Sequence, residues 1–139
     1  MGAERRLILV RHAKSGYPHG VPDHARPLSG KGRRNAQAAG HWFVAEGPRV
    51  SLVLCSDAMR ARHTWEIVRA DLVRARIDAP VRLAPVLYGA SPAAVIGLLR
   101  EVPDDVRSVV VVGHEPTMSG TALLLAGDGS EPEALARLR

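Results

Sequence analysis

Three short sets of residues in this chain could handle a phosphoryl group. Arg11 and His12 come directly after the apolar run 7–10, the set 56–64 follows a second apolar run, and Gly113-His114 follows a third. An arginine guanidinium offers a planar fork of N–H donors that matches phosphate oxygens. A neutral imidazole nitrogen is a competent nucleophile near neutral pH. These residue types predict phosphoryl binding and attack where three strands end.

The elements that position these residues follow from the hydrophobic pattern. Short apolar runs rich in β-branched residues are typical of parallel strands that are buried on both faces. Three such runs are found, at residues 7–10, 50–55 and 109–112, and a fourth, weaker run lies at residues 81–87. Parallel strands place their carboxyl ends at one edge of a sheet, where ligands of α/β proteins bind. Residues far apart in the sequence can therefore share one site.

Helical segments lie between the predicted strands. Ser29 can cap a helix that ends at Gly47-Pro48, and a second helix is expected to begin near Ser56 or Asp57. A third begins at Ser91-Pro92, a capping residue followed by proline. The alternating order predicts an α/β fold, a three-layer α/β/α sandwich with a mostly parallel central sheet.

Composition bounds the class of protein. A length of 139 residues with 46% hydrophobic content predicts one domain, residues 1–139. The net charge is +5, but the basic residues are scattered and no aromatic residue is interleaved with a basic run, which argues against nucleic-acid binding. The single cysteine, Cys55, fits a reducing compartment. Polar residues 1–6 and only four apolar residues after them predict neither a signal peptide nor a membrane span, so we expect a cytoplasmic protein.

Taken together, the motifs resemble the histidine phosphatase superfamily, which has the phosphoglycerate mutase-like fold. Its members carry Arg-His-Gly or Arg-His-Ala after the first strand, Ser-x-x-x-Arg-x-x-x-Thr after the second, and Gly-His or Ser-His after a later strand. This chain has Arg-His-Ala at 11–13, Ser56 to Thr64 with Arg60 between them, and Gly-His at 113–114. The segment Lys14-Ser15 and the pattern Asp-x-x-Arg-Pro-Leu-Ser-x-x-Gly at 23–32 are more specifically similar to the SixA-like branch of phosphohistidine phosphatases.

The resemblance implies a role for each matching residue. His12 would be the nucleophile that becomes transiently phosphorylated, Arg11 and Arg60 would bind the phosphoryl oxygens, and His114 would donate a hydrogen bond to the same group. Phosphoryl transfer asks mainly for positioning and for positive donors around the equatorial oxygens. We therefore expect no metal and no other cofactor. The sequence has no carboxylate cluster, no phosphate-binding loop of the GxxxxGK[ST] kind and no zinc-ligand spacing.

Two assignments need a choice between neighbours. Arg62 stands only two positions after Arg60, and side chains at i and i+2 of a helix point in roughly opposite directions, so only one can face the site. The family spacing from Ser56 selects Arg60. The long irregular stretch 16–28 is expected to form one wall of an open cleft, where Lys14 or Arg26 would contact the substrate.

The substrate class follows from a missing side chain. Larger relatives that act on phosphate esters place a glutamate after the third strand as the general acid, whereas this chain has no Asp or Glu between residues 79 and 100. An alkoxide leaving group needs such an acid. An imidazole, with a pKa of about 6.5, departs readily. The sequence thus favours phosphohistidine, although Tyr88 or Asp23 remains available as a proton donor.

Three hypotheses stay open. The first is a phosphatase for phosphohistidine on a protein, such as a histidine phosphotransfer domain. The second is a phosphatase for small phosphate esters, such as a nucleotide or sugar phosphate. The third is a non-catalytic module that binds phosphorylated proteins through Arg11, Arg60 and His114.

The C-terminal region departs from the family. Relatives usually carry another strand after the part that corresponds to residues 135–138, whereas residues 131–139 have the pattern of a short helix or tail. If that strand is missing, one sheet edge is exposed and dimerisation or instability is expected.

Overall fold

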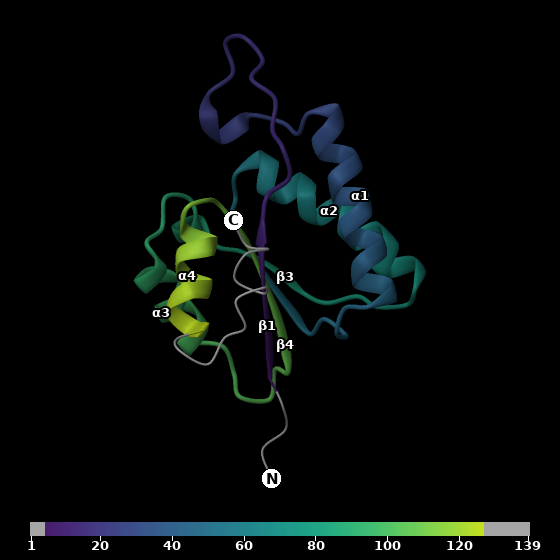
Figure 1. Ribbon diagram of the computed structural model, residues 1–139, viewed down its shortest axis with the longest axis vertical. Coiled ribbons are helices and arrows are strands. Elements are labelled where there is room, and N and C mark those ends of the chain that lie inside the picture. Colours follow the sequence, from purple (N-terminus) through teal and green to yellow (C-terminus); the bar gives the residue numbers. More distant parts are fainter. Residues whose placement is uncertain (1–4, 127–139) are drawn as a thin grey trace.

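The computed structural model describes residues 5–126 as an alternation of strands and helices (Figure 1). Its elements, in chain order, are β1 (Arg6–Arg11), α1 (Gly30–Ala45), β2 (Leu52–Cys55), α2 (Met59–Arg74), β3 (Val81–Leu83), α3 (Pro92–Arg100), β4 (Ser108–Gly113) and α4 (Thr117–Ala126). Two short 3₁₀ turns, η1 (Asp23–Ala25) and η2 (Pro85–Leu87), lie in the connections. None of the helices in this range is both long and apolar enough to cross a lipid bilayer.

The strands form one parallel sheet in the order β1-β4-β2-β3. Helices α1 and α2 cover one face, and α3 and α4 cover the other (Figure 1). The predicted three-layer α/β/α sandwich is thus confirmed. Because all the paired strands are parallel, β1, β2 and β4 end at the same edge, and the residues that follow them lie together there.

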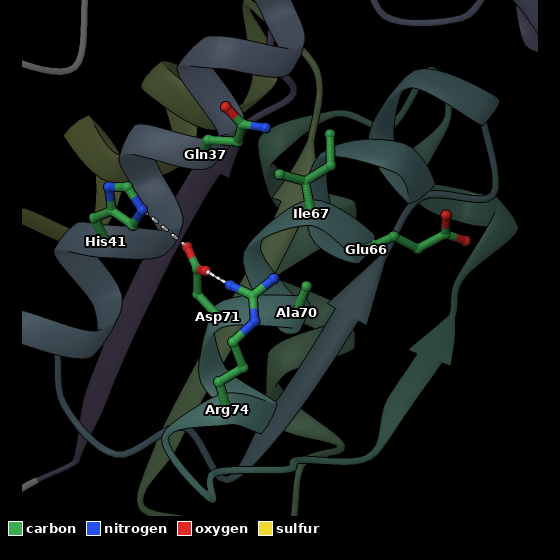
Figure 2. A pocket seen from close by; sticks show the side chains of 7 residues that line it. All are labelled: Gln37, His41, Glu66, Ile67, Ala70, Asp71 and Arg74. Carbon is green, nitrogen blue, oxygen red and sulfur yellow. Dashed lines mark hydrogen bonds and ion pairs between the residues drawn. The ribbon is translucent and has the colours of Figure 1, made fainter.

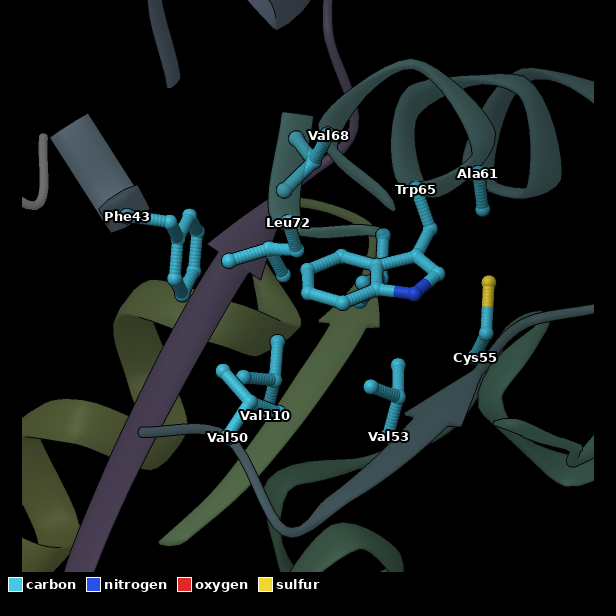
Figure 3. Packing of buried hydrophobic residues seen from close by; sticks show 10 residues of the cluster. Phe43, Val50, Val53, Cys55, Ala61, Trp65, Val68, Leu72 and Val110 are labelled. Carbon is cyan, nitrogen blue, oxygen red and sulfur yellow. The ribbon is translucent and has the colours of Figure 1, made fainter. Parts of the chain in front are cut away.

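Hydrophobic packing on both faces holds the sheet between the helices. Every residue of β4 is buried, which is why its sequence is a run of valines rather than an alternating pattern. On the face covered by α1 and α2, Trp65 packs edge-on against Phe43 with 5.5 Å between ring centroids (Figure 3). Each fully buried valine or leucine contributes roughly 1.5–3 kcal/mol relative to an exposed one.

The predicted helix caps at Ser29 and Ser91 are confirmed. The Ser29 hydroxyl accepts a hydrogen bond from the Gly32 N–H at 3.0 Å, and Ser91 accepts one from the Ala94 N–H at 3.2 Å. The second helix starts later than predicted, at Met59. The reason is that the Ser56 N–H still donates to the carbonyl of Val112 at 3.0 Å and so extends the sheet.

Two predictions about the strands were wrong in detail. The third strand ends at Leu83, because Pro85 has no N–H for the ladder and begins a 3₁₀ turn. The predicted burial on both faces holds for β2 and β4 but not for β1, which is an edge strand of the sheet within residues 5–126, with β3 at the other edge. The expectation for residues 131–139 lies outside the described residues.

Gly32 gives a test of the close packing of α1 against the backbone of Lys14. A Cβ at this position would lie 1.9 Å from the Lys14 carbonyl oxygen, a backbone atom that cannot turn aside. We expect Gly32→Ala to lower the free energy of unfolding by about 1–3 kcal/mol in urea denaturation. Gly30→Ala is the control, since its nearest neighbour is the Arg34 guanidinium at 3.7 Å. Equal stability of the two variants would contradict the close approach of α1 to Lys14.

Candidate active site

The ends of three parallel strands bring two histidines and a serine together. His12 follows β1, Ser56 follows β2 and His114 follows β4. The two imidazole rings lie 5.1 Å apart between centroids, and the Nε2 atom of His114 is 2.8 Å from the Ser56 hydroxyl. The sheet edge therefore assembles residues that are about a hundred positions apart in the sequence.

His12 is held in one tautomer by two neighbours. Its Nδ1 lies 2.7 Å from the Ala13 carbonyl, which only accepts, so Nδ1 carries the proton. Its Nε2 lies 3.3 Å from the Arg60 Nε–H, a donor, so Nε2 carries the lone pair. The Ala13 N–H in turn donates to the Thr64 hydroxyl at 2.9 Å, and Thr64 donates to the Arg60 carbonyl at 2.8 Å. These contacts tie the His12 segment to α2 and point the Nε2 lone pair at the guanidinium.

The charge state of His12 suits a nucleophile. Burial lowers the pKa of the imidazole below its usual value of 6.5, and the positive guanidinium groups of Arg60, Arg11 and Arg26 lower it further, against the raising effect of the Ala13 carbonyl. The ring is thus mainly neutral at pH 7. A neutral imidazole keeps the lone pair with which it can attack phosphorus.

His114 is a second neutral imidazole in the same centre. Burial, followed by the nearby His12 and Arg60, lowers its pKa to about 4. Its Nδ1 is buried and has no hydrogen-bond partner within residues 5–126. The Ser56 hydroxyl that contacts its Nε2 also accepts the Ala58 N–H at 3.2 Å. Ser56 therefore links the start of α2 to the second imidazole.

The choice between Arg60 and Arg62 of α2 is clear from their environments. Arg60 is 6% exposed and turns toward His12, whereas Arg62 is exposed to solvent. Arg11 lies close enough to His12 to affect its pKa, and its guanidinium has no hydrogen bond or ion pair with any residue in the described part of the chain. The centre thus has one arginine that is fixed and one whose donors are open.

Asp23, at the start of η1, closes the far side of the Arg60 guanidinium. Its carbonyl accepts from Arg60 Nη1 at 2.7 Å, and its Oδ2 accepts from Nη2 at 3.1 Å. The Tyr88 hydroxyl donates to Oδ2 at 2.5 Å, and Arg26 Nε donates to Oδ1 at 2.9 Å. The hydrogen bond from Tyr88, followed by those from Arg26 and Arg60, holds the pKa of this carboxyl well below its usual range. Asp23 is therefore ionised and has no proton to give near neutral pH.

The two expected substrate contacts differ in how free they are. Arg26 closes the base of the loop 16–28, since it donates to the Ser15 hydroxyl and the Gly16 carbonyl and stacks 4.2 Å from the Tyr17 ring centroid. Its side chain is only 13% exposed. Lys14 is exposed and lines a cavity of about 530 Å³ beside His12. Of these two side chains, Lys14 is thus the one that is free to reach a bound molecule.

A second concavity lies between α1 and α2, away from these residues. It measures about 390 Å³, and Figure 2 shows the Asp71 carboxylate at its centre, 2.7 Å from Arg74 and 3.6 Å from His41. None of the residues predicted for phosphoryl chemistry lines it. Across residues 5–126, no group of three or more metal-ligating side chains is found.

Sequence reasoning did not assign three of the residues that shape the centre. Ser56 begins the Ser-x-x-x-Arg pattern, but its contact with His114 needs the sheet order to be known. Asp23 and Tyr88 were considered only as proton donors, whereas they form a hydrogen-bonded pair on Arg60. The Asp-x-x-Arg spacing was a signal that the loop residues act together, although it did not show on which group.

Comparisons with known proteins agree with this geometry. Residues 7–90 match the family described as histidine phosphatase superfamily (branch 1). An uncharacterized protein from Mycobacterium tuberculosis is 48% identical over 127 residues, a match that covers 91% of this chain and 76% of the relative.

Two solved structures extend the likeness to the fold. A SixA protein from Nakamurella multipartitia is 37% identical with a TM-score of 0.78, covering 97% of this chain and 77% of that one. An Escherichia coli protein provisionally named an alpha-ribazole-5′-P phosphatase shares the fold alone, at 22% identity and a TM-score of 0.67, covering 97% of this chain and 85% of that one. The chain belongs to the histidine phosphatase superfamily, in its SixA-like branch.

Proposed function

We propose that this protein is a phosphohistidine phosphatase that removes the phosphoryl group from a histidine of another protein through a covalent phospho-His12 intermediate. The observation that carries the proposal is the fixed tautomer of His12. Its Nδ1–H is bound to the Ala13 carbonyl, and its Nε2 lone pair faces Arg60. A nucleophile placed against a phosphate-binding guanidinium is the arrangement that phosphoryl transfer requires.

In the first step, Nε2 of His12 attacks phosphorus. A P–N bond forms to His12, and the bond from phosphorus to the leaving nitrogen breaks with its electron pair going to that nitrogen. Arg60 and the open donors of Arg11 neutralise the equatorial oxygens. His114 contributes a third donor when its neutral ring carries the proton on Nδ1, the nitrogen that has no hydrogen-bond partner within residues 5–126. The Nδ1–H of His12 stays on the Ala13 carbonyl, which stabilises the positive ring that forms.

In the second step, water attacks the phosphorus of phospho-His12. A P–O bond forms, the P–N bond breaks and its electron pair restores the Nε2 lone pair. Hydrogen phosphate leaves, and one proton of the water is released to solvent. His12 returns to the neutral tautomer in which it began, so the enzyme is ready for another turn.

The substrate class is supported by the state of the nearby acids. Asp23 is ionised, and its hydrogen bond raises the pKa of the Tyr88 phenol, so neither group gives up a proton readily. No Asp or Glu occurs between residues 79 and 100. An imidazole leaving group tolerates this lack better than an alkoxide does. The Nakamurella structure, provisionally named a phosphohistidine phosphatase, agrees with this choice.

The alternative is a phosphatase for small phosphate esters, and the fold shared with the alpha-ribazole-5′-P phosphatase supports it. A non-catalytic module that binds phosphorylated proteins is the third reading. The proposed partner is a phosphorylated protein, such as a histidine phosphotransfer domain, and the proposed location is the cytoplasm. Neither nucleic acid nor a membrane has a part in this proposal.

The direct test is phosphate release from a histidine-phosphorylated protein and from a matched phosphate ester, with and without a metal chelator. We expect phosphohistidine to be preferred, the chelator to have no effect, and His12→Ala to remove turnover, because the nucleophile is lost. Faster turnover of the ester would favour the small-molecule reading. Unchanged phosphate binding by His12→Ala, without turnover by either protein, would favour the binding module.

Arg60 and Arg62 of α2 give a matched pair of variants. Arg60→Ala removes the guanidinium that contacts His12, and we expect roughly a 100-fold loss in kcat/KM, the scale of one preorganised donor. Arg62→Ala removes the same charge two positions away on the exposed face, and activity should stay within about twofold of wild type. Similar losses in both would point to overall charge rather than to a site built on Arg60.

The neutral histidines predict a definite titration. Since burial lowers the folded pKa of His12 below 6.5, its ring should bind a proton only below that pH, with His114 titrating near pH 4. Proton NMR of the imidazole C–H signals, assigned with His12→Ala and His114→Ala, measures both midpoints. The rate of His12 phosphorylation should fall with acidification through the His12 midpoint, because protonation removes the Nε2 lone pair. A His12 midpoint above 6.5 would contradict the buried, arginine-flanked environment.

A further inference from the structure

Asp23 is an anionic group placed at the edge of a centre otherwise built to hold an anion. The centre contains Arg11, Arg60 and two half-buried imidazoles, all suited to phosphoryl oxygens. A carboxylate beside such a cradle repels a phosphoryl group and competes with it for Arg60. A carboxylate at this place would, however, favour a substrate whose leaving group is positive or donates a hydrogen bond.

We propose that Asp23 determines leaving-group specificity by accepting a hydrogen bond from the ring N–H of the departing imidazole, and so selects phosphoryl groups that are linked to a protonated nitrogen base. This inference rests on the function proposed above and names the chemical feature of the substrate that the site reads. The ligand class is an N-phosphoryl imidazolium, not a phosphate ester.

The position of Asp23 relative to His12 fits the geometry of displacement. Arg60 contacts His12 through Nε and contacts Asp23 through Nη1 and Nη2, so the two residues lie at opposite ends of one guanidinium. The leaving group of an in-line displacement departs on the side of phosphorus away from the nucleophile. For a phosphoryl group bound along Arg60 next to His12, Asp23 would stand at the end from which the leaving group departs.

The carboxylate also has an acceptor to spare. An ionised carboxylate offers about four lone-pair sites. Tyr88 and Arg60 use Oδ2, and Arg26 uses one site of Oδ1. The side chain remains 53% exposed despite these contacts. One site on Oδ1 can therefore take an N–H from a bound ring, while the three donors keep the group in place.

Tyr88 adds an aromatic surface next to this acceptor. Its ring lies 5.6 Å from His114 between centroids and is 39% exposed, and Arg60 Cζ lies 5.9 Å from its centroid. Aromatic faces attract cations at such distances. A protonated imidazole would find a π surface and a carboxylate at the same side of the cradle, whereas a phenolate or alkoxide would be repelled.

The chemical step balances without a proton donor. In the reactive form the substrate ring is phosphorylated on one nitrogen and protonated on the other. When Nε2 of His12 attacks, the P–N bond of the substrate breaks and its electron pair returns to the ring. The imidazole leaves neutral with its N–H still on Asp23. Asp23 gains no proton, but it favours the protonated form of the substrate from which this departure is possible.

The test compares two small substrates, N-phosphoimidazole and para-nitrophenyl phosphate, with wild type, Asp23→Asn and Asp57→Asn. Asp23→Asn keeps the size of the side chain and removes its charge. We expect roughly a tenfold loss of kcat/KM for phosphoimidazole and an unchanged or higher value for the ester. In addition, the alkaline limb of the phosphoimidazole profile should move to lower pH, because the protonated substrate is no longer favoured.

Asp57→Asn is the matched control. Within the described residues this carboxylate pairs with His24 at 2.9 Å and contacts neither Arg60 nor Tyr88. Both substrates should be turned over by it at near wild-type rates. Equal losses on both substrates in Asp23→Asn, or the same selective loss in Asp57→Asn, would overturn the assignment of Asp23 alone. Failure of wild type to use phosphoimidazole, with or without ester turnover, would overturn the proposed function and this inference together.

Discussion

The Arg60 guanidinium is the group on which the arrangement of the site depends. It is nearly fully buried, and it spans the space between His12, the proposed nucleophile, and the Asp23 carboxylate. A buried arginine is stable only where its N–H groups are paired. The pairing that solves this folding problem also fixes the catalytic geometry, since the same contacts orient the His12 ring and hold the loop 16–28 against α2.

The sheet supplies the rigid frame for that guanidinium. Strand β4 lies between β1 and β2 and is completely buried, so the ends of all three strands are held at fixed positions. Thr64 then links α2 to the His12 segment through the Ala13 N–H and the Arg60 carbonyl. Packing of a valine-rich strand and one threonine hydroxyl thus set the distance between His12 and the Arg60 guanidinium.

Local patterns in the sequence predicted much of the architecture. The apolar runs, the serine caps and the strand-helix order predicted the sandwich and the convergence of His12, Ser56 and His114, because these depend on short-range chemistry and on general rules for parallel sheets. Edge positions could not be predicted, since burial of a strand depends on its neighbours in the sheet. The Asp23 contacts were also out of reach, because an irregular loop has no periodicity that fixes where its side chains point.

Placing two imidazoles beside arginines has an electrostatic cost, which a bound phosphoryl group would offset. Burial beside cations lowers the pKa of both rings, so the empty site disfavours the positive charge that His12 would acquire in the proposed phospho-His12 intermediate. A bound phosphoryl dianion reverses this balance, because its negative charge favours both a positive His12 ring and donation by His114. In the proposed reaction, the positive charge of the centre is therefore balanced only when a phosphoryl group binds. Asp23 offsets part of that excess positive charge while the site is empty, which lets so many cations and imidazoles fold together around Arg60.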